Sequence, residues 1–473
     1  MGGVKYKYAP DWAKYDPRFY GAFAAASSGT VNTAALQAAI DAAGTAGGGI
    51  VQVPEGVFTI RQIVLKGHVQ LRGAGHLATR LILESGQNKH AIINHVSTNG
   101  TTDPNALYCT VADLCIDGNK ANNTSGDGIY LTRNPAYAPA TNDEGGDSDL
   151  AWENQATIER VMVLRAKNNG FESSNIGSVR LTNCWAEHCD GHGFALGFDS
   201  MALQCVASNS GLNGFGIYAP SSHLVGCKSY YSGQLATGNG YEMAGYHLDS
   251  VAHVTMVGCE AQDNKGPGWL LDSSYGAIIQ GGMADSNSTY GVGSFPGVWI
   301  YAGYNNIVDV ACTERRANGT NSFQQNAVKL ESGTYGNNVT LSHWAETWNS
   351  ATVGTAIMSG STVSGNTVVV NNQLGSQAIT YASTITPDPY AGGKVIVGTL
   401  TGNITDLAAP SNAHIGCRLS FKFTQDATGS RTVGWNATYK KSWTISPTAN
   451  KISTIEFEYD GTNWIQVGGT VGI

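Results

Sequence analysis

Between residues 161 and 292 one pattern occurs six times, a short apolar run that ends at a small residue. The residues at this position are Val161, Cys184, Cys205, Cys227, Cys259 and Gly282. Their spacings are 23, 21, 22, 32 and 23, so the period is about 22 once one insertion is removed. A fixed period in this range is typical of a stacked repeat, in which each unit buries its apolar face against its neighbours.

A second mark follows each small residue, a glycine joined to a large apolar residue. These pairs are Gly170-Phe171, Gly193-Phe194, Gly214-Phe215, Gly245-Tyr246, Gly268-Trp269 and Gly291-Val292. In a solenoid of short parallel strands, equivalent residues on successive turns lie ~4.8 Å apart and side chains alternate in and out. The repeat therefore predicts which outward side chains lie side by side.

The nine cysteines of the chain fit this repeat better than they fit disulfides or a metal site. Cys184, Cys205, Cys227 and Cys259 share one inward column, where free cysteine packs as a compact hydrophobe. The sequence has no C-x-x-C pair, which argues against structural zinc. We expect reduced thiols in the core.

Composition narrows the class of protein further. Sixty glycines and 13% charged residues are typical of many tight turns between short strands. A net charge of −8 disfavours nucleic acid as a partner. The chain has no apolar run of ~18 residues that would span a membrane, and its first residues do not resemble a signal peptide.

The first residues predict a strap and then a cap. Residues 1–31 are aromatic and irregular, which indicates a strap or docking segment. From Asn32-Thr33, read as an N-cap, a helix is predicted over residues 34–43, ended by the glycines at 47–49. Strands are then expected at 50–54 and 57–60 and up to the LRGAG sequence at 71–75.

This series of a helix, GGGIVQVPEGVFTI and LRGAG resembles the entrance to the pectate-lyase-like right-handed β-helix superfamily. The resemblance implies an all-β protein, a right-handed parallel β-helix over residues 32–384 whose N-terminal helix caps the open end of the solenoid. A loop from about Asn134 to Asn154 interrupts the stack; its acidic residues are compatible with Ca²⁺ but more typical of a solvated loop.

Residues 385–473 differ in character and predict a small C-terminal antiparallel β-sandwich. Short alternating strands are expected at 394–400, 418–424, 431–435, 454–459 and 463–467. The closing FEYDGTNWIQV resembles the C-terminal domains of phage tail proteins. That resemblance implies a homotrimer on a virion tail, in contact with other tail proteins.

Chemistry is predicted where outward carboxylates share a column. The position three beyond each Gly-apolar pair's large residue holds Asp249 and Asp272 on adjacent turns, and Glu242 lies in the neighbouring insertion. Two carboxylates that close raise one another's pKa, which makes an acid/base pair. The residues expected to bind sugar beside them are His247, Tyr230, Tyr231 and Tyr246. The alternative is that both aspartates cap turns through Asx hydrogen bonds.

A second candidate is Gly191-His192-Gly193, with Asp190 before it. Polygalacturonase-like hydrolases of the superfamily carry Asn-Thr-Asp-Gly, a double Asp one turn later and then Gly-His-Gly. Asp127 and His192 match the first and third motifs, but Asn168-Asn169 stands in place of the double Asp and cannot supply the general acid. We therefore keep Asp190 and His192 as substrate-binding candidates.

These observations predict a tailspike-like depolymerase that cleaves a bacterial surface polysaccharide by glycosidic hydrolysis, with no required cofactor. The lysines and arginines that a lyase would need form no column, which keeps elimination of a uronate-containing glycan second. A non-catalytic glycan-binding tail fibre is the third reading, because one fold hosts many chemistries.

Overall fold

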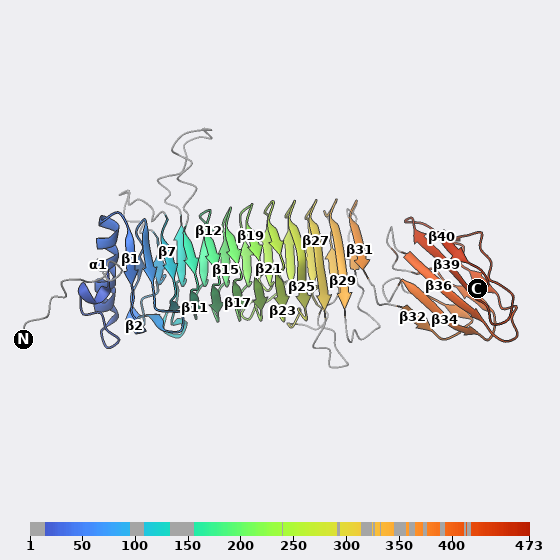
Figure 1. The fold of residues 1–473 in the computed structure, drawn as a ribbon, viewed down its shortest axis with the longest axis horizontal. Coiled ribbons are helices and arrows are strands. Elements are labelled where there is room, and N and C mark those ends of the chain that lie inside the picture. The colour runs from blue at the N-terminus through green and yellow to red at the C-terminus, as the bar shows by residue number, and fades with distance from the viewer. Residues whose placement is uncertain are drawn as a thin grey trace, which may run out of the picture. The chain divides into compact units, whose positions relative to one another are not determined.

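The computed structural model describes residues 15–94, 108–132, 156–238, 240–290, 294–313, 324, 327–331, 333–344, 356–358, 365–371, 376–387, 393–410, 413 and 418–473. The chain divides into two compact units, residues 1–337 with 345–366, and residues 338–344 with 367–473. No helix within the described ranges is long and apolar enough to cross a membrane. The first unit is a stack of short parallel strands behind one helix, as the sequence predicts (Figure 1).

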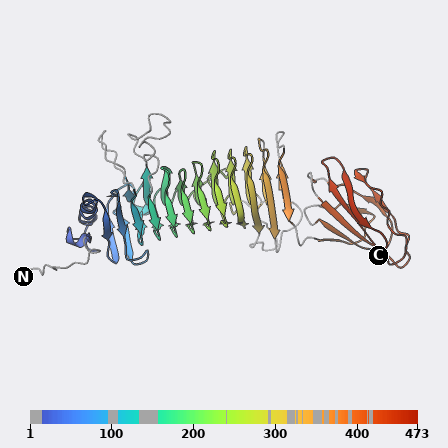
Figure 2. The same cartoon turned by 45° about the horizontal axis from the view of Figure 1, so that its top comes forward.

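Three strands make up most turns of the stack, and their ladders form the faces of a right-handed β-helix (Figure 2). The first ladder contains β1 (Gly49–Gln52), β4 (Val69–Arg72), β7 (Thr110–Ala112), β10 (Thr157–Glu159), β13 (Arg180–Thr182), β16 (Met201–Leu203), β19 (His223–Val225) and β22 (Thr255–Val257). The second contains β2 (Gly56–Ile60), β5 (Thr79–Leu83), β8 (Cys115–Asp117), β11 (Met162–Leu164), β14 (Trp185–Glu187), β17 (Val206–Ser208), β20 (Lys228–Tyr230) and β23 (Glu260–Gln262).

These two ladders merge where single strands run through both, which makes one 20-stranded sheet. The long strands are β25 (Ile278–Asp285), β27 (Ile307–Thr313), β29 (Asn338–Trp344) and β31 (Thr367–Asn371). The third ladder is a separate 11-stranded sheet, here called the site sheet. It contains β3 (Ile63–Val64), β6 (Ile92–Ile93), β9 (Ile129–Thr132), β12 (Phe171–Asn175), β15 (Phe194–Leu196), β18 (Phe215–Ile217), β21 (Tyr246–Asp249), β24 (Trp269–Asp272), β26 (Val298–Tyr301), β28 (Val328–Leu330) and β30 (Ala356–Met358).

The inward side chains of the site sheet form an aromatic stack. The rings of Phe171, Phe194, Phe215, Tyr246 and Trp269 follow one another with centroids 4.6, 4.7, 5.0 and 5.2 Å apart. Register pairing brings the large residue of each predicted Gly-apolar pair onto the next from 171 to 269. The next residue in the column is Val298, not Val292, so the sequence alignment of that last turn was wrong. Gly291 and Val292 lie outside the described residues.

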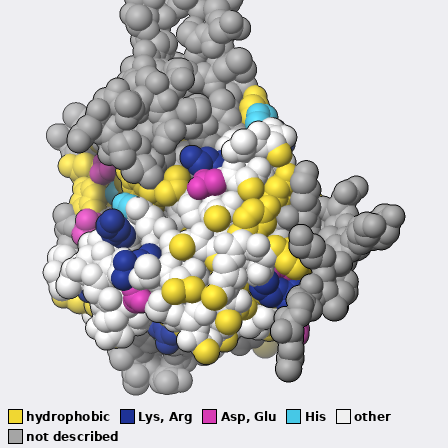
Figure 3. Space-filling model, turned by 90° about the vertical axis from the view of Figure 1, so that its left-hand side faces the viewer, with side chains coloured by type: hydrophobic (Ala, Val, Ile, Leu, Met, Phe, Trp, Pro, Cys, Tyr) yellow, Lys and Arg dark blue, Asp and Glu magenta, His cyan; other side chains and the backbone are white. Residues whose placement is uncertain are grey.

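The helix α1 (Gly29–Thr45) covers the N-terminal end of the stack and buries Leu36 and Ile40 against it. It follows a short 3₁₀ turn, η2 (Pro17–Phe19); a second, η3 (Lys120–Asn122), lies further along. Its N-cap is Ser28, not the predicted Asn32; the fully buried Asn32 amide instead donates to the Thr59 carbonyl at 3.0 Å. The surface of this end mixes hydrophobic and uncharged atoms with isolated charged groups (Figure 3).

The eight described cysteines are all buried and unpaired, which confirms the predicted core thiols. The column that starts at Cys184 continues through Cys205, Cys227 and Cys259, one residue before each strand of the second ladder. Burial keeps these sulfurs from solvent, and their Sγ atoms donate to carbonyls, as from Cys227 to the Ala202 oxygen at 3.3 Å. The repeat therefore predicted correctly that these cysteines are free thiols in the core.

The second unit contains two sheets around one core that includes Phe421, Phe457 and Trp464. The larger sheet has β32 (Ser376–Ile379), β34 (Lys394–Leu400), β36 (Arg418–Gln425), β39 (Ile452–Tyr459), β40 (Trp464–Thr470) and β38 (Tyr439–Lys440), and the smaller has β33 (Thr384–Ile385), β35 (Ile404–Leu407) and β37 (Val433–Trp435). Only β36, β39 and β40 pair antiparallel among the described strands; the other pairings are parallel. The larger sheet is thus mixed and the smaller is parallel, so the predicted antiparallel pairing was wrong in part. Alternation along a strand does not report its direction.

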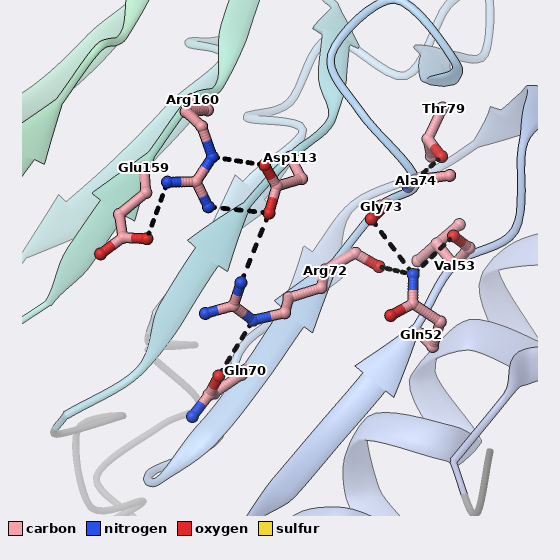
Figure 4. A network of polar contacts seen from close by, with 10 residues as sticks. All are labelled: Gln52, Val53, Gln70, Arg72, Gly73, Ala74, Thr79, Asp113, Glu159 and Arg160. Atoms are coloured by element: carbon pink, nitrogen blue, oxygen red, sulfur yellow. Dashed lines mark hydrogen bonds and ion pairs between the residues drawn. The ribbon is translucent and has the colours of Figure 1, made fainter. Parts of the chain in front are cut away.

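Charged side chains on the outer face of the 20-stranded sheet neutralise one another (Figure 4). Arg160 donates to both carboxylate oxygens of Asp113, at 2.6 and 2.9 Å, and Arg72 reaches the same carboxylate at 3.4 Å. The hydrogen bond from Arg160 holds the pKa of Asp113 below its usual range. Such exposed pairs contribute ~1 kcal/mol or less each. The Asp113 carboxylate is thus shared between two arginines, which stabilises this part of the surface.

Candidate active site on the outer face of the site sheet

Asp249 and Asp272 lie side by side, as the repeat predicts. They end β21 and β24 in direct register, and both side chains point outward because the preceding Leu248 and Leu271 are fully buried. Both aspartates are half-buried. A carboxylate oxygen from each and one ring nitrogen of His247 lie within 4.8 Å of one another. The sequence therefore located two outward carboxylates on one surface to within one strand spacing.

The pair differs from the charged groups of the other sheet because no described lysine or arginine forms an ion pair with either aspartate. Ser250 and Ser273 donate to Asp249 and Asp272 at 3.1 and 3.0 Å. No described backbone N–H donates to either carboxylate, so the alternative of turn-capping aspartates is not supported. Burial, together with the charge of Asp249, raises the pKa of Asp272 despite its serine hydrogen bond.

His247 precedes this pair on the same outward face of β21. It is 6% exposed, and burial lowers its pKa to about 4, so the imidazole is neutral near pH 7. Its Nδ1 lies 3.2 Å from the Nδ2 of Asn213, whereas its buried Nε2 has no hydrogen-bond partner among the described residues. An unpartnered buried nitrogen beside two carboxylates is costly for stability alone, which favours a functional role.

Aromatic side chains surround the pair on its C-terminal side. Tyr301 follows Asp272 in register, and the ring centroid of Tyr241, from the insertion, lies 6.1 Å from that of Tyr301 and 5.7 Å from that of Trp299. Trp299 donates to Glu331 at 3.0 Å. Burial, followed by the charge of Asp272, raises the pKa of Tyr241 to about 12. The predicted Glu242 follows Tyr241 in the insertion and is exposed.

A groove of about 630 Å³ lies further toward the N-terminus on the same face. Its lining includes His90, Asp127, Tyr130, Lys167, Asn169, Glu172, Ser174, Asp190 and His192. His90 Nδ1 lies 2.7 Å from the buried Asp127 carboxylate. Burial raises the pKa of Glu172, although Ser174 and Asn169 donate to its carboxylate. The groove thus holds a histidine–aspartate pair and a carboxyl group that favours its proton.

The second predicted pair, Asp190 and His192, lies in this groove. Lys120 and Lys167 each contact the Asp190 carboxylate at 2.7 Å. Burial alone would raise the pKa of Asp190, but these two hydrogen bonds outweigh it and lower the pKa. His192 occupies the expected turn column, since its backbone N–H donates to the Asn169 side chain at 2.7 Å.

One hydrogen bond runs from the groove to the outward column of the site sheet that contains the aspartate pair. The hydroxyl of Tyr218, in the outward column that leads to Asp249, lies 2.9 Å from Nε2 of His192. To reach it the Tyr218 ring lies flat across Gly216, where an added Cβ would stand 2.6 Å from the Tyr218 hydroxyl. Gly216 is not in the left-handed region, so the close approach of the Tyr218 ring is the reason that a glycine is needed here.

Replacing Gly216 with alanine is therefore expected to displace Tyr218 and break its bond to His192. Overpacking of this kind costs about 1–3 kcal/mol, so the fold survives. Thermal unfolding together with NMR of the His192 ring measures the two effects. Gly398 in β34 is a matched glycine, since it too lies outside the left-handed region and its added Cβ would meet no atom closer than 3.6 Å; its substitution should leave His192 unchanged. An unaltered His192 signal in G216A would contradict this geometry.

Three predicted sugar-binding tyrosines lie elsewhere. Tyr246 is fully buried in the aromatic stack, and its hydroxyl donates to the Cys227 and Glu260 carbonyls, so its assignment as a sugar-binding residue was wrong. It occupies the inward position that precedes His247. Tyr230 ends β20 in the 20-stranded sheet, and Tyr231 follows it. The structure does not bring these two onto the face of Asp249. The acidic loop at 134–154, expected to be solvated with Ca²⁺ as the alternative, lies outside the described residues.

The sequence reasoning missed Glu172 and Tyr301. Glu172 occupies the outward position directly after Phe171, whereas only the position three beyond the large residue was compared. Tyr301 was missed because the last glycine pair was aligned at 291 instead of 297. The position one beyond each large residue also points outward and contains Glu172. Alignment of the last turn on Gly297-Val298 places Tyr301 three residues beyond Val298, in the column of Asp272.

Comparisons with known proteins agree with this architecture. Residues 23–238 match the family described as rhamnogalacturonase A/epimerase, pectate lyase-like, and residues 385–464 match the phage tail fibre C-terminal domain family. Alginate lyase 7 of Azotobacter vinelandii is 32% identical over 212 residues, 41% of this chain and 22% of that protein. Mannuronan C5-epimerase AlgE2 of the same organism is 30% identical over 223 residues, 44% of this chain and 20% of that protein. The chain thus spans about a fifth of these relatives' length.

Solved structures show the same fold at low identity. The A-module of Azotobacter vinelandii mannuronan C-5 epimerase AlgE6 aligns with a TM-score of 0.53 and 19% identity, over 75% of this chain and 99% of the module. The enzymatically active domain of bacteriophage CBA120 tailspike protein 2 aligns with a TM-score of 0.56 and 14% identity, over 69% of this chain and 47% of that one. The chain joins a pectate lyase-like right-handed β-helix to a C-terminal domain of the phage tail fibre type.

Proposed function

We propose that this chain cleaves the glycosidic bonds of a polysaccharide by hydrolysis at Asp249 and Asp272. The observation that carries the proposal is the adjacent pair of outward carboxylates, within 4.8 Å and without a described cation to neutralise them. Its surroundings support the assignment, because the partly exposed rings of Tyr241 and Tyr301, packed over the buried Trp299, offer the aromatic surface that sugar rings favour. The two carboxylates need no cofactor for this reaction, and Ca²⁺ in the 134–154 loop stays the alternative to a solvated loop.

The environments of the two aspartates suggest their roles. Asp272, whose pKa is raised, acts as the general acid that protonates the leaving glycosidic oxygen. Asp249 attacks the anomeric carbon as that C–O bond breaks; water then displaces Asp249 and returns a proton to Asp272. A carboxylate spacing of about 5 Å is typical of such retaining enzymes, whereas inverting enzymes need about 6.5–9.5 Å for a water. Glu242, exposed on the insertion, is the third carboxylate of the proposed catalytic set.

We also propose the biological setting of this activity. The phage tail fibre match at 385–464 and the tailspike neighbour support a place on a virion tail, in contact with other tail proteins, and a bacterial surface polysaccharide as substrate. A homotrimer is consistent with exposed apolar residues on the outer face of the 20-stranded sheet. These residues are Met201, Leu203, Val225, Val257, Ile278 and Ile307. Light scattering after size exclusion measures the oligomeric state.

Digestion of a panel of bacterial capsular polysaccharides tests the proposed reaction. We expect new reducing ends from at least one glycan, without absorbance at 235 nm and without loss of activity in EDTA. Absorbance at 235 nm would identify an unsaturated product and overturn hydrolysis in favour of elimination. Glycan binding with neither signal would identify a non-catalytic tail fibre.

The groove supports a second candidate function, elimination or epimerisation on a uronate-containing glycan. Lys167 lines the groove and shares the Asp190 carboxylate with Lys120, so two ammonium groups for one carboxylate leave a net positive charge that suits a uronate. His90–Asp127 and Glu172 offer a base and an acid. The groove also falls within residues 23–238, which match the family that includes epimerases. Loss of a 235 nm signal in Glu172→Gln, with Asp272→Asn unaffected, would favour this candidate.

A further inference from the structure

The hydrogen bonds of Asn213 fix which nitrogen of His247 carries the proton. The Asn213 Oδ1 accepts from the Ala244 backbone N–H at 2.8 Å, and its Nδ2 donates to the Tyr241 carbonyl at 3.1 Å. Flipping this fully buried amide would set donor against donor and acceptor against acceptor. The group that faces His247 Nδ1 at 3.2 Å is therefore an N–H donor. A neutral imidazole that accepts at Nδ1 carries its proton on Nε2.

This polarity is the opposite of what a metal site requires. His247, Asp249 and Asp272 are close enough together to suggest a cation site by distance alone. A histidine that ligates a metal through one nitrogen usually donates its other N–H to a carboxylate or carbonyl oxygen. Here Nδ1 faces a donor and Nε2 carries hydrogen, so neither nitrogen offers a free lone pair. The cluster is better suited to hydrogen-bond a ligand than to hold an ion.

We propose that His247 donates its Nε2–H to a hydroxyl of an uncharged sugar residue at the cleavage point, in the tautomer that Asn213 fixes. A hydroxyl fits this position because it accepts from Nε2–H and donates its own hydrogen to a neighbouring carboxylate. A uronate carboxylate does not fit, since the negative charge of Asp249, which no described cation neutralises, repels it. The inference rests on the proposed function for its substrate, but the tautomer of His247 is independent of that function.

Nitrogen-15 NMR of the histidine-labelled protein tests the tautomer directly, with the His247 signal assigned by its absence in His247→Gln. We expect a neutral Nε2–H form at pH 7 that persists as the pH is lowered toward 5. An Nδ1–H form, or a protonated ring at pH 7, would overturn the proposal. Neither outcome depends on finding a substrate.

Asn213→Asp tests the positioning role of the amide. The carboxylate accepts from Nδ1–H, which moves the proton off Nε2 and creates the polarity of a metal ligand. We expect Zn²⁺ to bind this variant, by titration calorimetry, but not the natural chain. Zn²⁺ binding to the natural chain that is lost in His247→Ala would overturn the proposal, as would an unchanged tautomer in a folded Asn213→Asp protein.

Two variants test the ligand on a glycan that the natural chain cleaves. His247→Ala is expected to lower kcat/KM by about 10²–10³-fold, as removal of a buried donor does. Glutamine places an N–H near the Nε2 position, so His247→Gln should recover part of this loss; no recovery would overturn a donor role. The sugar at the new reducing end should be uncharged, and a uronic acid there would overturn the substrate assignment while leaving hydrolysis intact.

Discussion

Asp272→Asn is expected to lower the rate of glycosidic cleavage by about 10²–10⁴-fold, the usual contribution of a positioned general acid. The amide matches the carboxyl group in size and still accepts from Ser273, so the strand register should not change. It has no proton to give to a leaving oxygen. Release of reducing ends from the glycan identified by the panel measures the loss, and an unchanged unfolding temperature shows that the fold is kept.

Asp249→Asn should be at least as damaging if Asp249 is the nucleophile, because an amide forms no glycosyl intermediate. Asp309→Asn is the matched control, since Asp309 is a half-buried aspartate on β27 in the other sheet. That variant should cleave at the natural rate. Full activity in both site variants would remove the pair from the reaction and direct attention to Glu172 and Asp127.

The same pair predicts a pH dependence. A general acid works while protonated, and the raised pKa of Asp272 extends its protonated range to higher pH. Cleavage should therefore fall as the pH rises through that raised pKa, later than it would for an ordinary aspartate. Asp272→Asn should lack this limb in its residual activity. A profile that is the same for both proteins would assign the proton to another group.

The repeat made most of the fold and one part of the site predictable. Side chains at equivalent positions of successive turns must stack, so the column that contains Asp249 and Asp272 could be predicted from the sequence alone. The same regularity placed Cys184 and its equivalents in the core. The first residue of α1 was harder to predict, because serine and asparagine are both good N-caps. Only the structure shows that Asn32 is buried inside the helix and that Ser28 is the N-cap.

Contacts that do not follow the repeat could not be predicted from the sequence. The insertion breaks the register, and nothing in its residues states that Tyr241 folds back toward Trp299. The inward position of Tyr246 could have been read from its neighbour Phe215, since both follow a glycine at the same step. The polarity of Asn213 toward His247 depends on two backbone groups, at Ala244 and Tyr241, that no sequence pattern locates.

Phe194→Ala is expected to cost about 3–5 kcal/mol of unfolding free energy, the largest stability effect of any single change considered. Phe194 is fully buried between two rings of the aromatic stack, 4.6 Å from Phe171 and 4.7 Å from Phe215 by ring centroid. Truncation leaves a cavity that rigid neighbouring turns cannot fill, because each turn is held by backbone ladders on both sides. Denaturant titration followed by circular dichroism measures the loss.

Tyr275→Ala separates burial from stacking as the cause of that loss. Its ring stacks on Tyr304 at 4.9 Å, much as Phe194 stacks on its neighbours, but it is 38% exposed. Aromatic pairing alone contributes about 0.5–1.5 kcal/mol. We therefore expect the tyrosine variant to lose about 1 kcal/mol, several times less than the phenylalanine variant. Equal losses would mean that stacking, not removal of apolar surface from water, holds the turns of this β-helix together.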